Sequence, residues 1–287
     1  MYGFRSWLIL GRVSNLTTVW ANALCAWTLG GAGAINDLII LIFGLSLFYI
    51  GGMYLNDYCD TEFDYQHRPE RPIVSGKIKQ HVVLAATILV FVLGTAFIVW
   101  VSKDSLIYAL ILLTLIVSYN LIHKHHALIG VFLMGSCRSV VYLVAGAAST
   151  EGINLSIQIA AILMFFYISG ITVLARNESF SLKTPVISYV LLIVPLMSVL
   201  YIAGPYYEEK FLISFCLVTL WVILTFCRAR KKGTTIPGKA VSPLLAGICL
   251  IDLAILSSMY LVEFSTLGLF LGFFAIALLA QRYVPAT

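Results

Sequence analysis

A succession of long apolar runs constrains the fold of this chain more than any other feature of its sequence. A membrane-spanning helix needs roughly 20 mostly apolar residues. Only helices and closed barrels satisfy the backbone inside a bilayer, and these runs are too long for barrel strands. The sequence therefore predicts an all-α, polytopic membrane protein, a bundle of about nine to ten transmembrane helices. The candidate segments are 16–33, 38–55, 82–101, 106–122, 128–148, 155–175, 185–203, 211–227, 241–262 and 266–280.

The composition agrees with a chain that lies largely inside a membrane. Hydrophobic residues make up 61% of its 287 residues and charged residues 11%, whereas soluble domains carry about 25% charged residues. No low-complexity segment or linker interrupts the sequence, so residues 1–287 are predicted to form one transmembrane helical domain. The net charge of +5 comes from basic residues spread among membrane-flanking loops, which argues against nucleic-acid binding. The six cysteines lack metal-type spacing, and we interpret them as apolar fillers.

The basic residues are distributed unequally between alternate loops. Of the 18 Lys and Arg residues, 15 fall on one side of the predicted membrane, Lys103 and Lys210 fall on the other, and Arg138 lies inside a span. Loops rich in Lys and Arg stay in the cytoplasm. We therefore predict that both termini and the loop after segment 38–55 are cytoplasmic.

The densest charge of the chain lies from Asn56 to Gly76, in the string NDYCDTEFDYQHRPERPIVSG. Asn56, Asp60 and Asp64 recur at every fourth residue, which places them on one face if the preceding helix continues. Hard oxygen ligands of this kind suit Mg²⁺, which is usually shared with substrate phosphates. An ordinary solvated loop is the alternative, and the regular spacing argues against it.

Basic residues follow this acidic face immediately. Arg68, Arg71 and Lys77 offer donors for phosphate oxygens. Pro69 and Pro72 hold the loop out of a helix. Metal-binding carboxylates beside phosphate-binding cations, at the surface of a membrane, predict a site for a lipid diphosphate.

The pattern N-D-x-x-D-x-x-x-D followed by R-P-x-R-P-I-x-x-G resembles the first aspartate-rich motif of the UbiA superfamily of intramembrane prenyltransferases. This resemblance implies a UbiA-like helical topology and Mg²⁺ as cofactor. It also implies an isoprenyl diphosphate as donor and a lipophilic molecule as acceptor. The family implies nine spans against the ten apolar segments found here. The extra C-terminal segment is then either a departure from the family or a re-entrant hairpin.

A second resemblance lies at the end of segment 106–122. Tyr119 and Lys124, in the string SYNLIHKHH, resemble the Tyr-Ser-x-x-x-Lys element of UbiA-like enzymes, with Asn120 in place of the serine. Lys124 is placed to reach phosphate, and Tyr119 to donate a hydrogen bond or to stabilise a cation with its ring. A lysine snorkelling at a helix end is the alternative. We interpret the neighbouring histidines as a polar turn and not as a metal site.

The second aspartate-rich motif of the family, typically D-x-x-x-D, is missing where the resemblance places it. Arg176, Asn177 and Glu178 stand there instead. In one alternative, Asn177 and Glu178 supply oxygens to a metal and Arg176 replaces a metal's positive charge at the diphosphate. In the other, the second metal site is lost, and ordinary catalysis with it. The pattern is similar to that of the UbiA-like protein of the ebo cluster.

Asn22, Arg138 and Asp252 lie inside apolar segments, where such polar groups are costly and usually paired or lining a cavity. Asn22 either joins two helices by hydrogen bonds or contacts substrate. Arg138 either pairs with Asp252 or faces the diphosphate. The sequence leaves both alternatives open.

The leading hypothesis is a Mg²⁺-dependent membrane prenyltransferase that moves an isoprenyl group from a polyprenyl diphosphate to a lipophilic acceptor. The alternative is a catalytically degenerate UbiA-like protein that binds or transports a polyprenyl phosphate or a hydrophobic metabolite. Membrane lipid is an expected partner and nucleic acid is not. The expected residues are Asn56, Asp60, Asp64, Lys124 and Tyr119 for catalysis; Arg68, Arg71, Lys77, Arg176, Arg138 and Asn22 for substrate; and Asn56, Asp60, Asp64 and Glu178 for metal.

Overall fold

The computed structural model of the protein describes residues 3–124, 126–179, 186–204, 208–231, 234–235 and 237–286. The fold is built from helices, and two-residue strands β1 (Arg230–Lys231) and β2 (Thr234–Thr235) pair antiparallel after α10. A short 3-10 helix, η1 (Val13–Asn15), precedes α2. The α-helices are α1 (Phe4–Leu10), α2 (Leu16–Leu29), α3 (Ile35–Cys59), α4 (Thr61–His67), α5 (Gln80–Val101), α6 (Ser105–Ile122), α7 (Ala127–Ala147), α8 (Leu155–Ser179), α9 (Val186–Ala203), α10 (Glu209–Ala229), α11 (Pro237–Ala246), α12 (Ile248–Met259) and α13 (Phe264–Ala280).

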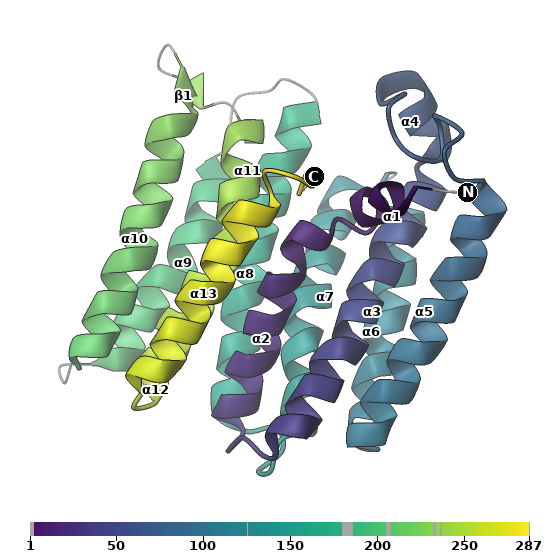
Figure 1. Ribbon diagram of the computed structural model, residues 1–287. Coiled ribbons are helices and arrows are strands. Elements are labelled where there is room, and N and C mark those ends of the chain that lie inside the picture. The colour runs from purple at the N-terminus through teal and green to yellow at the C-terminus, as the bar shows by residue number, and fades with distance from the viewer. Residues whose placement is uncertain are drawn as a thin grey trace.

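The long helices run side by side between the two ends of the molecule (Figure 1). Helix α2 lies inside the bundle, where it packs against α3, α7, α12 and α13, and ten of its 14 residues are buried. Helices α3 and α5 approach closely where Gly44 and Gly94 face each other, because a Cβ atom on either would lie 3.0 Å from the other's carbonyl oxygen. Small residues allow such contacts between helices in membranes.

Seven helices in the described part of the chain are long and apolar enough to cross a membrane, or eight if α11 and α12 form one bent span. Helices α2 and α13, with 14 and 17 residues, match two further predicted segments but are shorter than a full span. The prediction of an all-α, multi-pass membrane protein is confirmed, and the predicted count of nine to ten spans holds only approximately.

The predicted segment 241–262 is not one straight helix. It bends by 44° between α11 and α12. The break lies at Gly247, four residues after Pro243, which lacks the backbone N–H that a helix interior needs.

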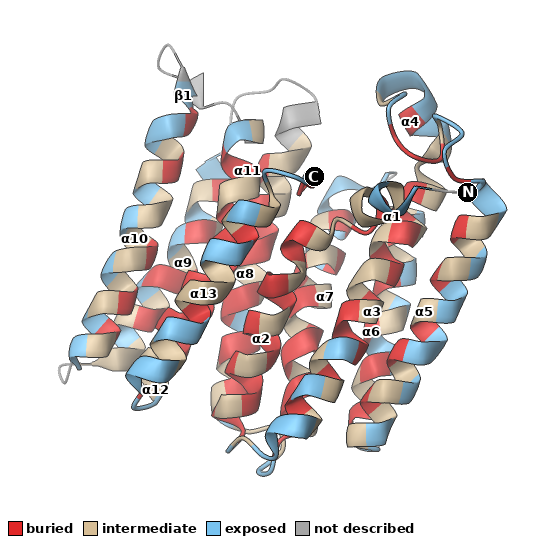
Figure 2. Cartoon of the chain, in the orientation of Figure 1, coloured by how far each residue is buried: buried red, intermediate tan, exposed pale blue. Residues whose placement is uncertain are grey.

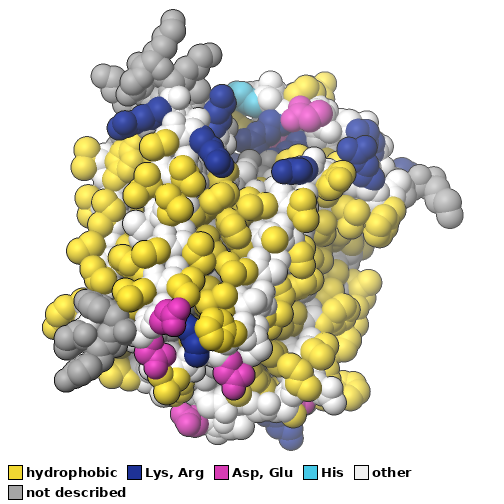
Figure 3. Space-filling model, turned by 60° about the vertical axis from the view of Figure 1, so that its left-hand side comes forward, with side chains coloured by type: hydrophobic (Ala, Val, Ile, Leu, Met, Phe, Trp, Pro, Cys, Tyr) yellow, Lys and Arg dark blue, Asp and Glu magenta, His cyan; other side chains and the backbone are white. Residues whose placement is uncertain are grey.

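Apolar side chains cover the outside of the bundle as well as its interior. Figure 2 shows exposed patches along the outer faces of α5 and α10 and buried residues along the inside of α2 and α7. Ile88, Val92 and Trp100 on α5 are all more than half exposed, a pattern that fits a lipid environment. On the face in Figure 3, Lys and Arg gather at one end and most acidic side chains at the other, with a hydrophobic belt between them.

Candidate active site

A cavity of 770 Å³ extends into the bundle from the end that carries α4. Its mouth is lined by charged residues of α4 and the loop that follows it. Its deeper wall is apolar: Leu45 and Phe48 precede Asp60 by 15 and 12 residues on α3, roughly 18–23 Å along a helix. The cavity therefore suits a molecule with a charged head and an apolar tail. The apolar lining comprises Val19, Leu45, Phe48, Leu112, Ile116, Val141, Ile168, Ile171, Val241 and Leu245.

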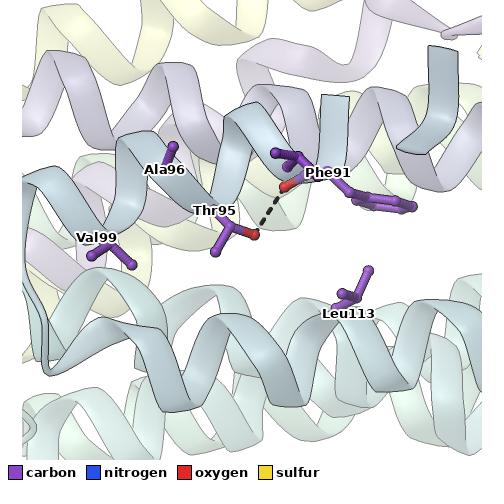
Figure 4. Close-up of a pocket in the computed structure, with 6 residues that line it drawn as sticks. Phe91, Thr95, Ala96, Val99 and Leu113 are labelled. Atoms are coloured by element: carbon purple, nitrogen blue, oxygen red, sulfur yellow. Dashed lines mark hydrogen bonds between the residues drawn. The ribbon is translucent and has the colours of Figure 1, made fainter. Parts of the chain in front are cut away.

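A second pocket, of 410 Å³, lies between α5 and α6 and has a different character. Figure 4 shows Thr95 donating its hydroxyl to the carbonyl oxygen of Phe91, at 2.8 Å, so its polar atom is already bonded within α5. No charged side chain lines this pocket. The charged residues that could take part in a reaction therefore line the larger of the two cavities. The smaller one is lined by Phe91, Val92, Thr95, Ala96, Val99 and Leu113.

The predicted acidic face is formed across the junction of α3 and α4. The amide of Asp60 donates to the carbonyl of Asn56, and the amide of Asp64 donates to that of Asp60, both at 2.8 Å. Helical bonding thus passes through the junction, as the spacing predicts. Asn56, Asp60 and Asp64 all line the cavity.

Asn56 is engaged by neighbours in a way that its predicted role as a metal ligand did not anticipate. Its Oδ1 accepts a hydrogen bond from Arg12 Nη2 at 3.1 Å, and its Nδ2 donates to Asn120 Oδ1 at 3.1 Å. A guanidinium therefore occupies the oxygen that would face a metal. The geometry makes Asn56 a residue that joins α3 to α6 and to the chain before η1.

Asp57 is a site residue that the sequence analysis missed. It is buried and holds two guanidinium groups, Arg12 at 3.2 Å and Arg71 at 3.4 Å. Arg12 has a left-handed backbone, with φ at 43°, and such non-glycine strain is often found at functional sites. One feature of the sequence could have revealed Asp57: it is a carboxylate inside an apolar helix, next to Asn56, the first residue of the four-residue spacing.

Asp60 faces the end of α6. Lys124 Nζ lies 2.8 Å from Asp60 Oδ1 and donates to the carbonyl oxygen of Cys59, also at 2.8 Å. That carbonyl lies at the C-terminus of α3, where a cation is stabilised by the helix dipole. His123 Nε2 is 3.7 Å from Asp60, and the His123 ring stacks on Tyr119 at 4.6 Å. The structure therefore brings Tyr119 and Lys124 to the acidic face, and both line the cavity.

Asp64 is 4% exposed, and its carboxylate makes no hydrogen bond or ion pair with the described residues. Burial raises the pKa of its carboxyl; Arg71 opposes this, and the carboxylates of Asp57 and Asp60 add to it. A buried carboxylate without a partner is unfavourable until a cation arrives. Among the described side chains, no three from His, Cys, Asp and Glu converge to hold a metal. The residues fit a Mg²⁺ ion held by Asp60 and Asp64 and completed by water or phosphate oxygens.

The raised pKa of Asp64 predicts how stability depends on pH. The folded protein binds this proton at a higher pH than the unfolded chain does, so stability rises as pH falls between the two values. Without metal, the protein should become more resistant to unfolding as pH falls through the raised pKa toward the ordinary value of 3.8. Denaturant titrations at several pH values check this.

The matched control for that titration is Asp64→Asn, which should lack this gain. Burial lowers the pKa of His123, which has the opposite effect on stability at low pH. His123 is present in both proteins, so its contribution cancels in the comparison. An identical pH profile for the two proteins would contradict the prediction.

The sequence predicts further basic residues at the site besides Lys124: Arg68, Arg71, Arg176 and Lys77. Arg68 and Arg71 line the cavity, and Arg68 makes no ion pair with the described residues. Arg176 on α8 also lines it and donates from Nη1 to the carbonyl oxygen of His123 at 2.9 Å. Lys77 is exposed and does not line the cavity, so the structure does not bring it together with the other predicted site residues. The side chains of Asn177 and Glu178, and all of His125, lie outside the described residues.

Deeper in the bundle, a buried polar network joins α2, α7 and α12. Asn22 Nδ2 donates to Asp252 Oδ2, and Arg138 Nη1 donates to Asn22 Oδ1, both at 2.8 Å. Tyr142 also donates to Asp252, and Arg138 Nη2 reaches the Thr18 hydroxyl at 3.0 Å. Arg138 and Asp252, whose direct pairing was one of two open alternatives, are joined through Asn22. Arg138 lines the cavity and Asn22 does not, so the structure favours the alternative in which Asn22 joins helices by hydrogen bonds.

The sequence profile of the UbiA prenyltransferase family matches residues 14–179, more than half of the chain. The chain belongs to the UbiA prenyltransferase family. The match covers α2 to α8, and thus every cavity-lining carboxylate and Arg176. As a member of this family, the chain is related to transferases that move prenyl groups within membranes.

Two curated relatives of this UbiA family member are archaeal. Digeranylgeranylglyceryl phosphate synthase of Methanoregula boonei is 27% identical over 145 residues, 50% of this chain and 52% of the relative. The enzyme of the same name from Sulfolobus acidocaldarius is 27% identical over 164 residues, 57% of this chain and 59% of the relative. The matched part of the chain thus spans little more than half the length of either relative.

Solved structures show the same fold over nearly the whole UbiA family chain. A UbiA homologue from Archaeoglobus fulgidus, bound to GPP and Mg²⁺, superposes with a TM-score of 0.65 at 15% identity, covering 96% of this chain and 99% of the homologue. A structure of digeranylgeranylglyceryl phosphate synthase gives a TM-score of 0.63 at 20% identity, covering 91% of this chain. The UbiA-like topology expected from the sequence is confirmed.

Proposed function

We propose that this protein is a Mg²⁺-dependent prenyltransferase that moves an isoprenyl group from a polyprenyl diphosphate to a lipophilic acceptor in the membrane. The observation that supports this most strongly is Asp64, a buried and unpaired carboxylate beside Asp60 at the charged mouth of a cavity with an apolar wall. A diphosphate head and an isoprenyl tail match those two environments. The Archaeoglobus fulgidus homologue with bound GPP and Mg²⁺ supports the same choice of donor and metal.

The cations around the mouth act on the leaving group. When the bond between the allylic carbon and oxygen breaks, its electron pair leaves with the diphosphate, whose negative charge increases. Arg68, Arg71 and Lys124 line the mouth and stabilise that charge, usually the largest single contribution to catalysis. Mg²⁺ bound by Asp60 and Asp64 supplies further charge neutralisation there.

The deeper wall protects the reacting carbon. Phe48 and Ile116 line the cavity below the charged mouth and exclude water from the allylic cation. The ring of Tyr119 faces the same cavity and stabilises positive charge through its π face. The acceptor, a lipophilic molecule that enters from the membrane, captures the cation and releases a proton.

Arg176 supports this function despite the missing second aspartate motif. It lines the same cavity as Lys124, and its guanidinium is held by the carbonyl oxygen of His123. A fixed guanidinium at this place supplies positive charge to a diphosphate without a second metal. We infer that Arg176 takes over part of the role that the family assigns to metal-bound aspartates.

The test uses purified protein in detergent with radiolabelled geranylgeranyl diphosphate, with and without Mg²⁺. Bound label and released pyrophosphate are scored separately, with Asp60→Asn as the blank. Pyrophosphate release that requires both Mg²⁺ and Asp60 supports the proposed transferase. Binding without release, in the presence of membrane lipid extract as a source of acceptor, favours the alternative of a binding or transport protein.

We further propose that the end of the bundle that carries the cavity mouth is cytoplasmic. Both described chain ends and α4 lie at this end (Figure 1), and Lys and Arg side chains gather there on the face shown in Figure 3. A reporter fused to either terminus should therefore register the cytoplasm, following the positive-inside rule. A reporter at Lys103 or Lys210 serves as the matched control and should register the opposite side.

A further inference from the structure

The segment after α13 returns into the bundle instead of leaving it. Helix α13 ends at Ala280, and the following residues cross the top of the bundle between α11 and α1 (Figure 1). Val284 and Ala286 are only 8% and 5% exposed. Pro285 and Ala286 line the 770 Å³ cavity. Residues 284–286, here called the tail, thus form part of the cavity wall.

Two polar contacts hold the tail in place. Asn15 Nδ2 donates to the carbonyl oxygen of Ala286 at 3.0 Å, a buried bond between residues 271 positions apart. Just before the tail, Gln281 Nε2 donates to the carbonyl oxygen of Ser242 at 3.0 Å. The tail therefore bridges η1 and α11. Its own side chains are apolar, so displacing Pro285 and Ala286 from Asn15 breaks the hydrogen bond to the Ala286 carbonyl and separates no ion pair among the described residues.

The tail lies at the same end of the bundle as the charged mouth, on the side of α11 (Figure 1), where it lines the cavity together with the apolar residues Val241 and Leu245. The same Asn15 amide that holds Ala286 also donates to the Tyr49 hydroxyl at 3.2 Å. Tyr49 precedes Asp60 on α3 by 11 residues, roughly 16 Å along a helix. The Arg138 guanidinium lies 5.7 Å from the centre of the Tyr49 ring. A chain that extends from the mouth toward Tyr49 and α11 therefore meets Pro285 and Ala286.

We propose that the tail determines the length of the isoprenyl chain that this cavity accepts. A short chain fits with the tail in place, whereas a long chain needs the volume that Pro285 and Ala286 fill and must displace them from Asn15. The inference rests on the proposed function, because it assumes a prenyl diphosphate with its head at Asp60 and Asp64. It adds a specificity-determining segment that lies outside residues 14–179, the part matched by the family profile.

The test immobilises the tail in the full-length protein. The variant carries Asn15→Cys and Ala286→Cys, bridged by a short bis-methanethiosulfonate reagent that a reductant removes. Cys137 also lines the cavity, so the variant and its control both carry Cys137→Ser. The matched control has Ala286→Cys without Asn15→Cys and receives the same reagent. Binding of radiolabelled geranyl diphosphate and geranylgeranyl diphosphate is measured with Mg²⁺, before and after reduction.

The bridged protein should bind the longer ligand at least about tenfold more weakly than after reduction, with the shorter ligand changed by less than about twofold. Deleting residues 284–287 should shift the preference toward the longer ligand. Equal effects on both ligands, or no effect of the bridge, would overturn the inference, as would failure of the bridge to form. If the reduced variant and the control bind neither ligand, the proposed function itself fails, and this inference fails with it.

Discussion

Replacing Asp64 with Asn should abolish Mg²⁺-dependent binding of an isoprenyl diphosphate and lower prenyl transfer by at least about 100-fold. The Asp64 carboxylate is buried at the mouth and makes no ion pair with a described residue. The amide keeps the size of the side chain but removes the charge that binds the metal. Equilibrium binding of labelled geranylgeranyl diphosphate across a Mg²⁺ titration measures the effect, with pyrophosphate release as the second readout.

The matched control for this substitution is Asp104→Asn. Asp104 is exposed, does not line the cavity, and precedes α6 at the opposite end of that helix from Lys124. It should bind and react as the wild type does. Asp64→Asn should unfold no more readily than the wild type, because it replaces an unpaired buried charge with a neutral group. A well-folded Asp64→Asn protein with unchanged Mg²⁺-dependent binding would eliminate the metal role assigned to this carboxylate.

Replacing Asn22 with Leu should lower the free energy of unfolding by about 3–5 kcal/mol. The Asn22 amide bridges Arg138 and Asp252, which are buried in the bundle and make no direct ion pair. Leucine has a similar volume but offers neither donor nor acceptor, so both charged groups lose a hydrogen bond at once. Unfolding of the purified protein in mixed micelles measures the loss.

Thr28→Ala, also on α2, is the control for that experiment. The Thr28 hydroxyl donates to the carbonyl oxygen of Leu24 within the same helix, so its removal leaves no buried charge unpaired and should change stability by less than about 1 kcal/mol. An Asn22→Leu protein as stable as the Thr28→Ala protein would show that Arg138 and Asp252 find other partners. Because Arg138 lines the cavity, Asn22→Leu should also weaken ligand binding in the protein that remains folded.

Local sequence patterns predicted much of the site because helical geometry relates residues that are close in the chain. The four-residue spacing of Asn56, Asp60 and Asp64 placed them on one cavity wall, as expected. The length of the apolar segment 106–122 likewise predicted that Lys124 lies just after the end of a membrane helix, and α6 ends at Ile122. The same reasoning could not place Lys77, because a loop residue has no periodicity that fixes its direction, and its side chain is exposed away from the cavity lining.

Contacts between distant segments were beyond such reasoning. The sequence showed that Asn56 is polar within an apolar run, but only the fold brings the Arg12 guanidinium to its side-chain oxygen. Asp57 was overlooked because it departs from the four-residue period, although it holds both Arg12 and Arg71. Nor does any pattern reveal that the tail after α13 returns to Asn15.

The sequence by itself determined that this protein is a bundle of membrane helices with an acidic face and a basic loop at one end. Those features follow from hydropathy and from the 3.6-residue turn, which act over short stretches of chain. The tertiary structure alone decided which polar groups are left without partners. Asp57 holds both Arg12 and Arg71, whereas the Asp64 carboxylate makes no ion pair with a described residue, and that allocation depends on packing between segments far apart in the sequence.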